Sequence, residues 1–445
     1  MCFPVIKEGY CLHFGSTLSF LYKSKNVSYF ISLNEDATNI FLECDGLSSI
    51  DKITHNLSSK YGEDYDEIKD VVSSFILNNK YLDIFDEPKP REIVITGSKD
   101  LQSPLHLLFE LTDFCNWNCK HCFNDSSSLQ DDFIDSTKLI SFLRQMSNMG
   151  VNTLNLSGGE PLFHPQFNEI VEEASKLFKK IIILSNGTLI NEKHIDIFKK
   201  YKDKITLRLT LNSSTFEYMD DFVGKSGAFN RVNEVISLVA SEGVNVEVAM
   251  ICTPYNMDDM VDVAKLSRKL GASKLEIGII TSIGRAIDYE DYIFSEDSLS
   301  EFEDKYRLFV DEFRDYMFTS EEFQIMKSEE FQIMIENSKN DAFRKGNCGV
   351  GLRSISVTST GKVKLCPIDV NSFFNMGNVL EEDLKSVFLR MEKFGFDKMD
   401  VPQIMVCGQC QHLSFCSNCI VKGFIMYNKL GSQCLWGEKY SGFVK

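Results

Sequence analysis

The chain lacks any hydrophobic run long enough to cross a lipid bilayer, which takes about 20 consecutive apolar residues. Its first ten residues have neither a basic segment nor a long apolar segment, so they do not resemble a secretory signal peptide. Basic residues are in deficit: 47 lysines and arginines stand against 64 aspartates and glutamates, a formal net charge of −17. Such a surface repels phosphate, and no local basic patch is present. We therefore expect a cytoplasmic protein with no nucleic-acid partner and no membrane partner.

The length and the cysteine content indicate a large protein with metal sites. A chain of 445 residues, 43% of them hydrophobic, is long enough for roughly three domains, which excludes a disordered chain and a small disulfide scaffold. Its 14 cysteines are better explained as metal ligands, because disulfides are rare in a reducing cytoplasm. Most of them gather at residues 115–122 and 348–434. The scattered Cys2, Cys11, Cys44 and Cys252 are expected to be buried free thiols.

The first block, residues 1–90, combines a strand with short amphipathic helices. Val27–Leu33 alternates apolar and polar residues, as a half-buried strand does. The helical periodicity predicts helices over Glu35–Cys44, Ser49–Tyr61 and Tyr65–Asn79. The two prolines of Glu87–Pro90 block both a helix and a central strand, so this segment marks a linker.

The second block, residues 100–290, alternates strands and helices regularly. The expected strands are Leu105–Leu111, Thr153–Ser157, Lys180–Ser185, Ile205–Leu211, Asn245–Cys252 and Lys274–Ile280. The expected helices between them are Asp135–Met149, Gln166–Leu177, Asn191–Tyr201, Ala228–Ser241 and Asp258–Leu270. Strands separated by helices form a parallel sheet, and closure into a barrel or partial barrel places the chemistry at the carboxyl ends of its strands.

The remaining chain divides into a helical bridge, residues 291–345, and a cysteine-rich block, residues 346–445. Ser295–Asn337 has a helical pattern that contains an eight-residue tandem repeat starting at Ser320 and again at Ser328, which we interpret as a local duplication. In the last block, a hairpin is expected over Ser354–Cys366. Metal ligation is expected to replace part of the hydrophobic core there.

Three cysteines follow the first expected barrel strand, in the sequence Cys115-Asn-Trp-Asn-Cys119-Lys-His-Cys122. Three thiolates leave one iron of a four-iron cluster without a protein ligand, which is the open position that chemistry at iron needs. A zinc ion is the alternative, although a structural zinc site takes a fourth ligand. His121 adjoins Cys122 and is therefore badly placed to bind the same metal.

The second expected strand ends in Ser157-Gly158-Gly159-Glu160-Pro161. A Gly-Gly-Glu turn at this place, after a C-x3-C-x2-C loop, resembles the radical S-adenosylmethionine (SAM) superfamily. The resemblance implies that the three cysteines carry a catalytic [4Fe–4S] cluster and that the turn holds the amino group of SAM. Glycine permits close backbone approach, and a carboxylate attracts an ammonium group. It also implies that one electron cleaves SAM, and that the resulting 5′-deoxyadenosyl radical removes a hydrogen atom from the substrate.

The same resemblance implies further contacts to SAM. His121 matches an aromatic position that lies against the adenine. Ser185 and Asn186 match a segment near the ribose and methionine parts, and Thr210 keeps a hydroxyl group at the end of the fourth strand. Lys225 stands where relatives often place an arginine near the SAM carboxylate, although lysine and arginine are not equivalent for binding a carboxylate.

The C-terminal cysteines resemble those of the SPASM domain, which holds two auxiliary [4Fe–4S] clusters. The resemblance assigns Cys407, Cys410, Cys416 and Cys434 to a distal cluster, and Cys348, Cys366 and Cys419 to a proximal cluster. The proximal set is one ligand short. Its fourth iron either is open and binds a substrate thiolate, or takes water or another residue. Zinc remains the alternative ligand for the C-x2-C pairs.

The strand and helices of the first block resemble the RiPP recognition element, which binds the leader of ribosomally made, post-translationally modified peptides (RiPPs). A plain winged-helix interaction module is the alternative. In the family, the leader adds as an extra strand to a sheet edge and packs on the third helix. We expect the edge at Val27–Leu33 and the helix at Tyr65–Asn79.

The order of these blocks resembles the sactipeptide and ranthipeptide thioether synthases over nearly the whole chain. The resemblance implies an α/β fold: a partial (β/α)6 radical-SAM barrel between an N-terminal winged-helix-like domain and a C-terminal SPASM domain. The cofactors would be SAM and three [4Fe–4S] clusters. The partners would be a precursor peptide, with a leader and core cysteines, and a low-potential electron donor, either flavodoxin or ferredoxin. The alternatives are carbon–carbon cross-linking, epimerisation, formylglycine formation, or a zinc-stabilised peptide-binding scaffold without chemistry.

Overall fold

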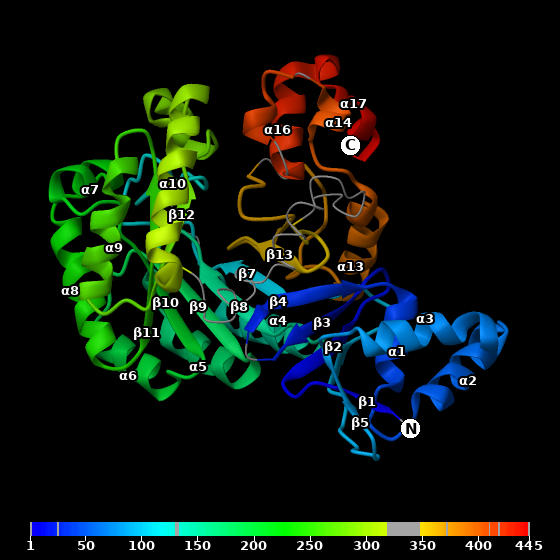
Figure 1. Ribbon diagram of the computed structural model, residues 1–445. Helices are drawn as coiled ribbons and strands as arrows, with labels where there is room; N and C mark the ends of the chain where they lie inside the picture. The colour runs from blue at the N-terminus through cyan, green and yellow to red at the C-terminus, as the bar shows by residue number, and fades with distance from the viewer. Residues whose placement is uncertain are drawn as a thin grey trace. The chain divides into compact units, whose positions relative to one another are not determined.

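The computed structural model describes residues 2–24, 26–129, 133–317, 348–370, 373–408, 410–416 and 419–443. The chain forms two compact units (Figure 1). The first consists of Met1–Leu105 with Asn148–Val151, and the second of His106–Ser147 with Asn152–Lys445.

The first unit contains two small sheets and three helices. A four-stranded sheet has the order β4 (Asn26–Leu33), β3 (Ser19–Lys23), β2 (Tyr10–Phe14) and β6 (Ile95–Gly97). A second sheet pairs β1 (Phe3–Ile6) with β5 (Leu82–Phe85), and the helices are α1 (Glu35–Glu43), α2 (Ile50–Tyr61) and α3 (Tyr65–Leu77). The expected strand and three helices are confirmed. Among the described residues, β4 and β6 are the two edges of the larger sheet.

Local hydrogen bonds and a shared core explain why these helices form. The side chains of Asn34, Ser49 and Asp64 accept hydrogen bonds from the first turns of α1, α2 and α3 and so begin each helix. Their apolar faces and the strands meet in one core whose members include Leu12, Leu21, Phe41, Ile53 and Ile76. The hydrophobic effect therefore holds the strands and the helices of this unit together.

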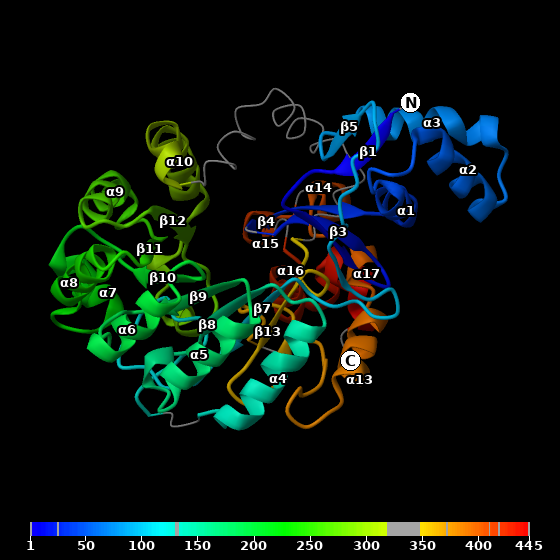
Figure 2. The same cartoon turned by 90° about the horizontal axis from the view of Figure 1, so that it is seen from below.

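The second unit is built on an eight-stranded sheet with the order β12-β11-β10-β9-β8-β7-β13-β14. Its parallel part comprises β7 (His106–Glu110), β8 (Thr153–Ser157), β9 (Lys180–Ser185), β10 (Ile205–Thr210), β11 (Asn245–Cys252) and β12 (Lys274–Ile279). Helices α4 (Ser136–Asn148), α5 (Phe167–Leu177), α6 (Glu192–Lys200), α7 (Phe216–Val223), α8 (Ala228–Ser241) and α9 (Met260–Lys269) lie between the strands. Figure 2 shows helices covering the outer face of this curved sheet. The expected partial (β/α)6 barrel is confirmed.

Alternation along β10 shows how the barrel separates its two faces. Ile205, Leu207 and Leu209 are almost fully buried, whereas Arg208 and Thr210 line a cavity on the opposite face. Because successive side chains of a strand point to opposite faces, the apolar set packs under the helices and the polar set faces the barrel interior.

The C-terminal part adds a hairpin to the barrel sheet. Strand β13 (Ser354–Val357) pairs in parallel with β7, and β14 (Val363–Lys364) pairs antiparallel with β13. The expected hairpin is confirmed, but its addition to the barrel sheet was not expected. The α-helices described after it are α13 (Leu384–Lys393), α14 (Ile404–Cys407), α15 (Leu413–Cys416), α16 (Ile420–Leu430) and α17 (Leu435–Tyr440). Phe424 of α16 and Trp436 of α17 belong to an aromatic core, with their ring centroids 4.8 Å apart.

Helix α10 (Glu296–Met317) confirms the first part of the expected helical bridge. The tandem repeat that starts at Ser320 lies outside the described residues. Across the described part of the chain, no helix is both long enough and apolar enough to pass through a membrane.

Candidate functional site

A cavity of about 390 Å3 lies among the cysteine loop and residues at the carboxyl ends of several barrel strands. Its walls contain most of the radical-core residues expected from the sequence: Cys115, Cys119, His121, Cys122, Gly158, Gly159, Ser185, Asn186 and Thr210. Parallel strands end at the same edge of a sheet, which brings these distant segments together. Glu160 and Lys225 are not among the lining residues.

The three thiols of this cavity suit metal ligation. Burial raises the pKa of Cys115 to about 12 and raises the pKa of Cys119 well above its ordinary value. Thiols in such surroundings stay protonated unless a cation stabilises the thiolate. A bound metal supplies that charge and deprotonates a coordinating thiol. The chemistry of this donor set therefore fits an iron–sulfur cluster.

The cysteine loop is held by a turn that the sequence did not single out. Gly284 and Arg285 begin the short helix η3 (Gly284–Asp288), and the backbone N–H of Arg285 donates to the carbonyl of Cys122 at 2.9 Å. The Arg285 guanidinium donates to the carbonyls of Cys119 and Ser126, at 2.9 and 2.6 Å. A Cβ at Gly284 would lie 2.3 Å from the carbonyl oxygen of Phe123, so only glycine fits this approach. Its place shortly after β12, at the strand ends, was the indication available in the sequence.

The Gly158–Gly159 turn packs directly on the backbone of the cysteine loop. The N–H of Gly159 donates to the carbonyl of Thr112 at 2.7 Å, and that of Glu160 donates to Phe114 at 2.8 Å. A Cβ at Gly159 would lie 2.3 Å from the carbonyl oxygen of Phe114. The close approach that the glycines allow is therefore to the chain's own backbone, while both still face the cavity.

Glu160 holds protein groups rather than facing the cavity. Its carboxylate is fully buried and accepts hydrogen bonds from the Ser185 hydroxyl at 2.8 Å, the Asn186 N–H at 2.8 Å and the Leu162 N–H at 3.1 Å. Burial outweighs these contacts and raises the pKa of Glu160 to about 7. The expected contact between this carboxylate and an ammonium group stays a prediction, and in the structure the carboxylate contacts protein groups. Glu160 fixes the end of β9, and the backbone and glycines of the turn face the cavity.

Asn116 is a second residue that sequence reasoning missed. Its side-chain oxygen accepts from the Asn186 amide at 2.8 Å, and its nitrogen donates to the Thr188 hydroxyl at 2.9 Å. These contacts tie the Ser185–Thr188 segment to the cysteine loop. The expected residues Ser185 and Asn186 are therefore fixed from two sides, by Glu160 and by Asn116.

His121 presents a neutral aromatic ring to the cavity. The ring stacks on Phe222 with 4.8 Å between centroids, and burial lowers the pKa of His121 to about 4. Its Nδ1 atom is buried without a hydrogen-bond partner among the described residues. A flat neutral ring with an unused polar atom is compatible with an aromatic base, and its place beside an adenine stays a prediction.

Lys225 lies away from the cavity. It is exposed in the loop after α7, where its N–H donates to the carbonyl of Asp220. The structure thus does not bring the expected cation to the site. Arg208 and Arg285 line the cavity instead, and Arg208 forms ion pairs with Glu247 at 2.7 Å and Glu276 at 2.5 Å. The position of Arg208 on the inward face of β10 was the indication in the sequence.

Four C-terminal cysteines surround a second cavity, of about 380 Å3: Cys407, Cys410, Cys416 and Cys434. Burial, with smaller contributions from the other three thiols, raises the pKa of Cys416 to about 12. The four thiols line one cavity and influence one another electrostatically, as neighbouring groups do. The structure therefore gathers the set expected for a distal cluster.

Cys348, Cys366 and Cys419 form a third group. Burial raises the pKa of Cys366 to about 12, with smaller contributions from Cys419 and Cys348. Across the described ranges, no three potential ligand side chains are close enough to share a single metal ion. A four-iron cluster instead binds each thiolate at a different iron atom. Of the scattered cysteines, Cys11, Cys44 and Cys252 are buried free thiols, as expected, and Cys2 is half-buried.

Two protein-family models match the sequence. The radical SAM superfamily model matches residues 109–267, and the SPASM model, an iron–sulfur cluster-binding domain, matches residues 348–411. The first match contains the cysteine loop and the Gly-Gly-Glu turn, and the second contains Cys348, Cys366, Cys407 and Cys410.

Similar proteins extend beyond these two domains. The antilisterial bacteriocin subtilosin biosynthesis protein AlbA of Bacillus subtilis (strain 168) is 27% identical over 98% of this chain and 96% of its own. Mycofactocin maturase MftC of Mycobacterium tuberculosis (strain CDC 1551 / Oshkosh) is 24% identical over 74% of this chain and 81% of its own. The crystal structure of Streptococcus suis SuiB bound to precursor peptide SuiA has a TM-score of 0.64 at 16% identity, over 95% of this chain and 97% of that chain. That likeness supports the fold.

Proposed function

Since this chain is a radical SAM enzyme that carries a SPASM domain, we propose that it joins cysteine sulfur atoms to carbon atoms in a ribosomally made precursor peptide. The observation that carries the proposal is the position of Cys366. Its loop borders the radical cavity, because Ile368, two residues further on, is one of the lining residues. A sulfur atom held by the third cysteine group would therefore lie close to where the peptide carbon is activated.

We assign Cys115, Cys119 and Cys122 to the first [4Fe–4S] cluster. SAM and this cluster, when bound and reduced, supply the 5′-deoxyadenosyl radical that takes a hydrogen atom from the peptide. The chain's own residues position the reactants: His121 offers its ring to the adenine, and Gly158, Gly159, Ser185, Asn186 and Thr210 line the place for the rest of SAM. Buried Trp117 and the apolar wall formed by Leu184, Ile251 and Ile280 exclude water from the reacting atoms.

We assign Cys407, Cys410, Cys416 and Cys434 to a distal auxiliary cluster, and Cys348, Cys366 and Cys419 to a proximal one. Because the proximal set has three thiolates, its fourth iron would be free to bind the thiolate of a substrate cysteine. The alternative is that water or another residue fills this position. Each thioether removes two hydrogens from the peptide: one leaves the carbon as a hydrogen atom taken by the 5′-deoxyadenosyl radical, and the other leaves the thiol as a proton. The electron released when sulfur bonds to carbon would leave through the auxiliary clusters. A low-potential donor such as flavodoxin or ferredoxin would supply the electron that starts each cycle.

Leader binding is assigned to the first unit. Strand β4 is an edge of its four-stranded sheet, so one side of its backbone is available to an added strand. Helix α3 carries Val71, which is 67% exposed, between the partly buried Ile68 and Phe75. We therefore divide the chain into a recognition domain at 1–90, a radical core at 100–290, a bridge at 291–345 and a SPASM domain at 346–445. The similarity to a subtilosin biosynthesis protein along nearly its whole length supports this arrangement.

The test is mass spectrometry on a short cysteine-containing peptide encoded beside the gene. The anaerobically reconstituted enzyme would be mixed with this peptide, SAM and a strong reductant. We expect the loss of two hydrogens per linked cysteine, with those thiols no longer open to alkylation. Release of 5′-deoxyadenosine with free thiols and an unchanged mass would reject thioether synthesis in favour of epimerisation. Bound zinc without iron and without 5′-deoxyadenosine would favour the scaffold alternative.

A further inference from the structure

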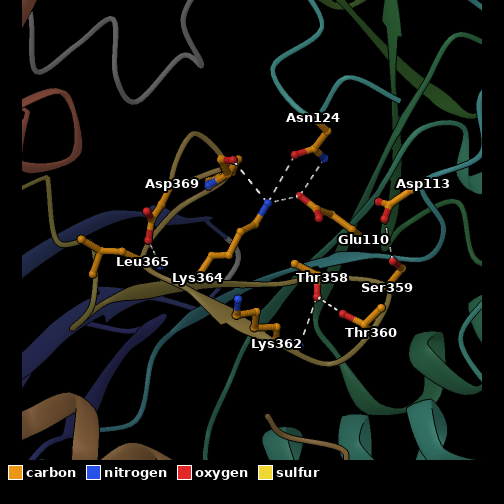
Figure 3. A network of polar contacts seen from close by, with 11 residues as sticks. Glu110, Asp113, Asn124, Thr358, Ser359, Thr360, Lys362, Lys364, Leu365 and Asp369 are labelled. Carbon is orange, nitrogen blue, oxygen red and sulfur yellow. Dashed lines mark hydrogen bonds and ion pairs between the residues drawn. The ribbon is translucent and has the colours of Figure 1, made fainter. Parts of the chain in front are cut away.

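A buried ion pair joins the first barrel strand to the hairpin that leads to Cys366 (Figure 3). Glu110 is the last residue of β7 and Lys364 the last of β14, and their side chains are 2% and 4% exposed. Lys364 Nζ lies 2.8 Å from Oε1 of Glu110. The amide of Asn124 donates to the same oxygen at 3.0 Å and accepts from Lys364 at 3.4 Å. We call these three side chains the Glu110–Lys364–Asn124 bridge.

The bridge ends beside two different groups of cysteines. Asn124 stands two residues after Cys122, and Lys364 stands two residues before Cys366. Lys364 also donates to the carbonyl of Pro367, within the loop that carries Cys366, at 3.4 Å. Asn124 lines the radical cavity, whereas Glu110 and Lys364 lie outside its wall. The ion pair therefore does not face the reacting atoms and can act only through the segments it holds.

Two further carboxylates, Asp113 and Asp369, hold the same segments. Ahead of the cysteine loop, Asp113 accepts a hydrogen bond from the Ser359 hydroxyl at 3.1 Å (Figure 3). Beyond the hairpin, the fully buried carboxylate of Asp369 accepts from the N–H groups of Leu365 and Phe373, at 3.3 and 3.2 Å. The cysteine loop is thus tied to the hairpin at both ends, and the loop of Cys366 is itself fixed.

Stability alone is a poor reason for such a pair. Moving two charges out of water carries a large desolvation penalty, and apolar residues of similar size often stabilise a fold equally well. What a buried pair adds is geometry, because its directional contacts are satisfied in only one arrangement of the segments. Here those segments are the Cys115–Cys122 loop, which leads to Asn124, and the Cys366 loop, which leads to Ile368.

We infer that the Glu110–Lys364–Asn124 bridge sets the position of the Cys366 loop relative to the Cys115–Cys122 loop. Glu110, Lys364 and Asn124 are positioning residues. The consequence of this inference rests on the proposed function. The bridge keeps the place where hydrogen is removed aligned with the place where sulfur bonds to carbon. If the two loops drift apart, SAM is still cleaved, but fewer cleavages lead to a cross-link.

The test compares Lys364→Met and the double variant Glu110→Met/Lys364→Met with wild type, all as reconstituted holoenzymes. Lys199→Met is the matched control, since Lys199 forms a solvent-exposed ion pair with Glu242 in the same unit. The readout that does not depend on the peptide is the magnetic interaction between the reduced radical cluster and the reduced proximal cluster, measured by pulsed electron paramagnetic resonance. Iron content, 5′-deoxyadenosine release and cross-links per 5′-deoxyadenosine are measured on the same samples.

In both bridge variants we expect a broadened distribution of inter-cluster distances, iron content as in wild type, and a roughly tenfold fall in cross-links per 5′-deoxyadenosine. The single variant leaves Glu110 unpaired and lowers the unfolding midpoint. The double variant regains the midpoint but not the narrow distribution, which separates positioning from stability. A wild-type distance distribution in both variants would overturn the inference. If wild type itself forms no cross-link, the proposed function fails, and the inter-cluster distance still decides the role of the bridge.

Discussion

Arg285 is the side chain whose loss should most directly release the radical cysteine loop. Its guanidinium holds two loop carbonyls and pairs with Asp125 at 2.9 Å. For Arg285→Met, we expect the loss of about four iron atoms per chain and a fall of about tenfold or more in 5′-deoxyadenosine release. Iron and sulfide analysis after reconstitution measures the first effect. Arg268→Met is the control, because Arg268 forms an exposed pair with Asp315. Full iron loading of Arg285→Met would show that the loop does not need this clamp.

The burial of His13 predicts that the stability of the first unit depends on pH. It is fully buried between the Thr96 hydroxyl and the Ser103 carbonyl, each 2.9 Å from a ring nitrogen, and burial lowers its pKa from 6.5 to about 4. Between these pH values the unfolded chain binds a proton that the folded chain does not. The stability that depends on neutral His13 is therefore fully present above pH 6.5 and is lost as the pH falls toward 4.

The size of this effect can be measured locally. From the two pKa values, His13 should cost the first unit about 2 kcal/mol of unfolding free energy between pH 7 and pH 5. Hydrogen exchange of the β2 amides in urea reports this free energy, and His13→Gln should lack this part of the pH dependence. An equal slope for wild type and His13→Gln would show that other groups cause it.

Leader binding is predicted at two elements of the first unit, strand β4 and helix α3. An added strand protects amides along the edge it joins. Hydrogen exchange should therefore slow in β4 and α3 when the precursor peptide is added, but not in β6, the opposite edge of the same sheet. Protection of β6 with none in β4 would place the leader elsewhere.

Substitution on α3 tests the same surface. Val71→Asp should weaken binding of the precursor about tenfold, because it places a charge on an apolar contact. Leu308→Asp is the matched control, since Leu308 is a similarly exposed apolar residue, 72% exposed, on α10 of the other unit. Fluorescence anisotropy of a labelled precursor measures both affinities. Equal affinities for the two variants would exclude α3 from the binding surface.

The elements also show what sequence patterns can predict. Strands β8, β9 and β11 end at the expected residues, because each lies between helices and glycine- or asparagine-rich turns. Strands β2 and β3 were not expected, since consecutive residues are buried in each and the side chains show no alternation of apolar and polar residues. The pairing of β13 with β7 joins segments more than 240 residues apart and has no local pattern.

In the candidate site, too, some features follow from local sequence patterns and others only from tertiary packing. Motif spacing identified the cysteines and the glycine turn, because those residues are close together in the sequence. The inward-facing Arg208 and the clamp of Arg285 depend on how strands align, and the direction of the Glu160 carboxylate depends on its contacts with β9. Such features follow from tertiary packing, which one sequence does not display.

At the scale of the whole molecule, the three cysteine groups should have separable roles. Replacing Cys348, Cys366 and Cys419 together by alanine should remove about four iron atoms per chain and abolish cross-linking. 5′-Deoxyadenosine release should persist, because the first group remains complete. Iron analysis, together with chromatography of 5′-deoxyadenosine, measures both outcomes. Cross-linking at the wild-type rate in this variant would show that the proximal group takes no part in sulfur–carbon bond formation.

In the proposed reaction, the enzyme removes a hydrogen atom from the carbon that receives the sulfur. The most direct measurement uses a precursor peptide deuterated at its non-cysteine residues, with mass analysis of both the peptide and the 5′-deoxyadenosine. We predict that one deuterium enters 5′-deoxyadenosine for each thioether formed. Thioethers formed without deuterium in 5′-deoxyadenosine would show that the 5′-deoxyadenosyl radical does not take the hydrogen from that carbon.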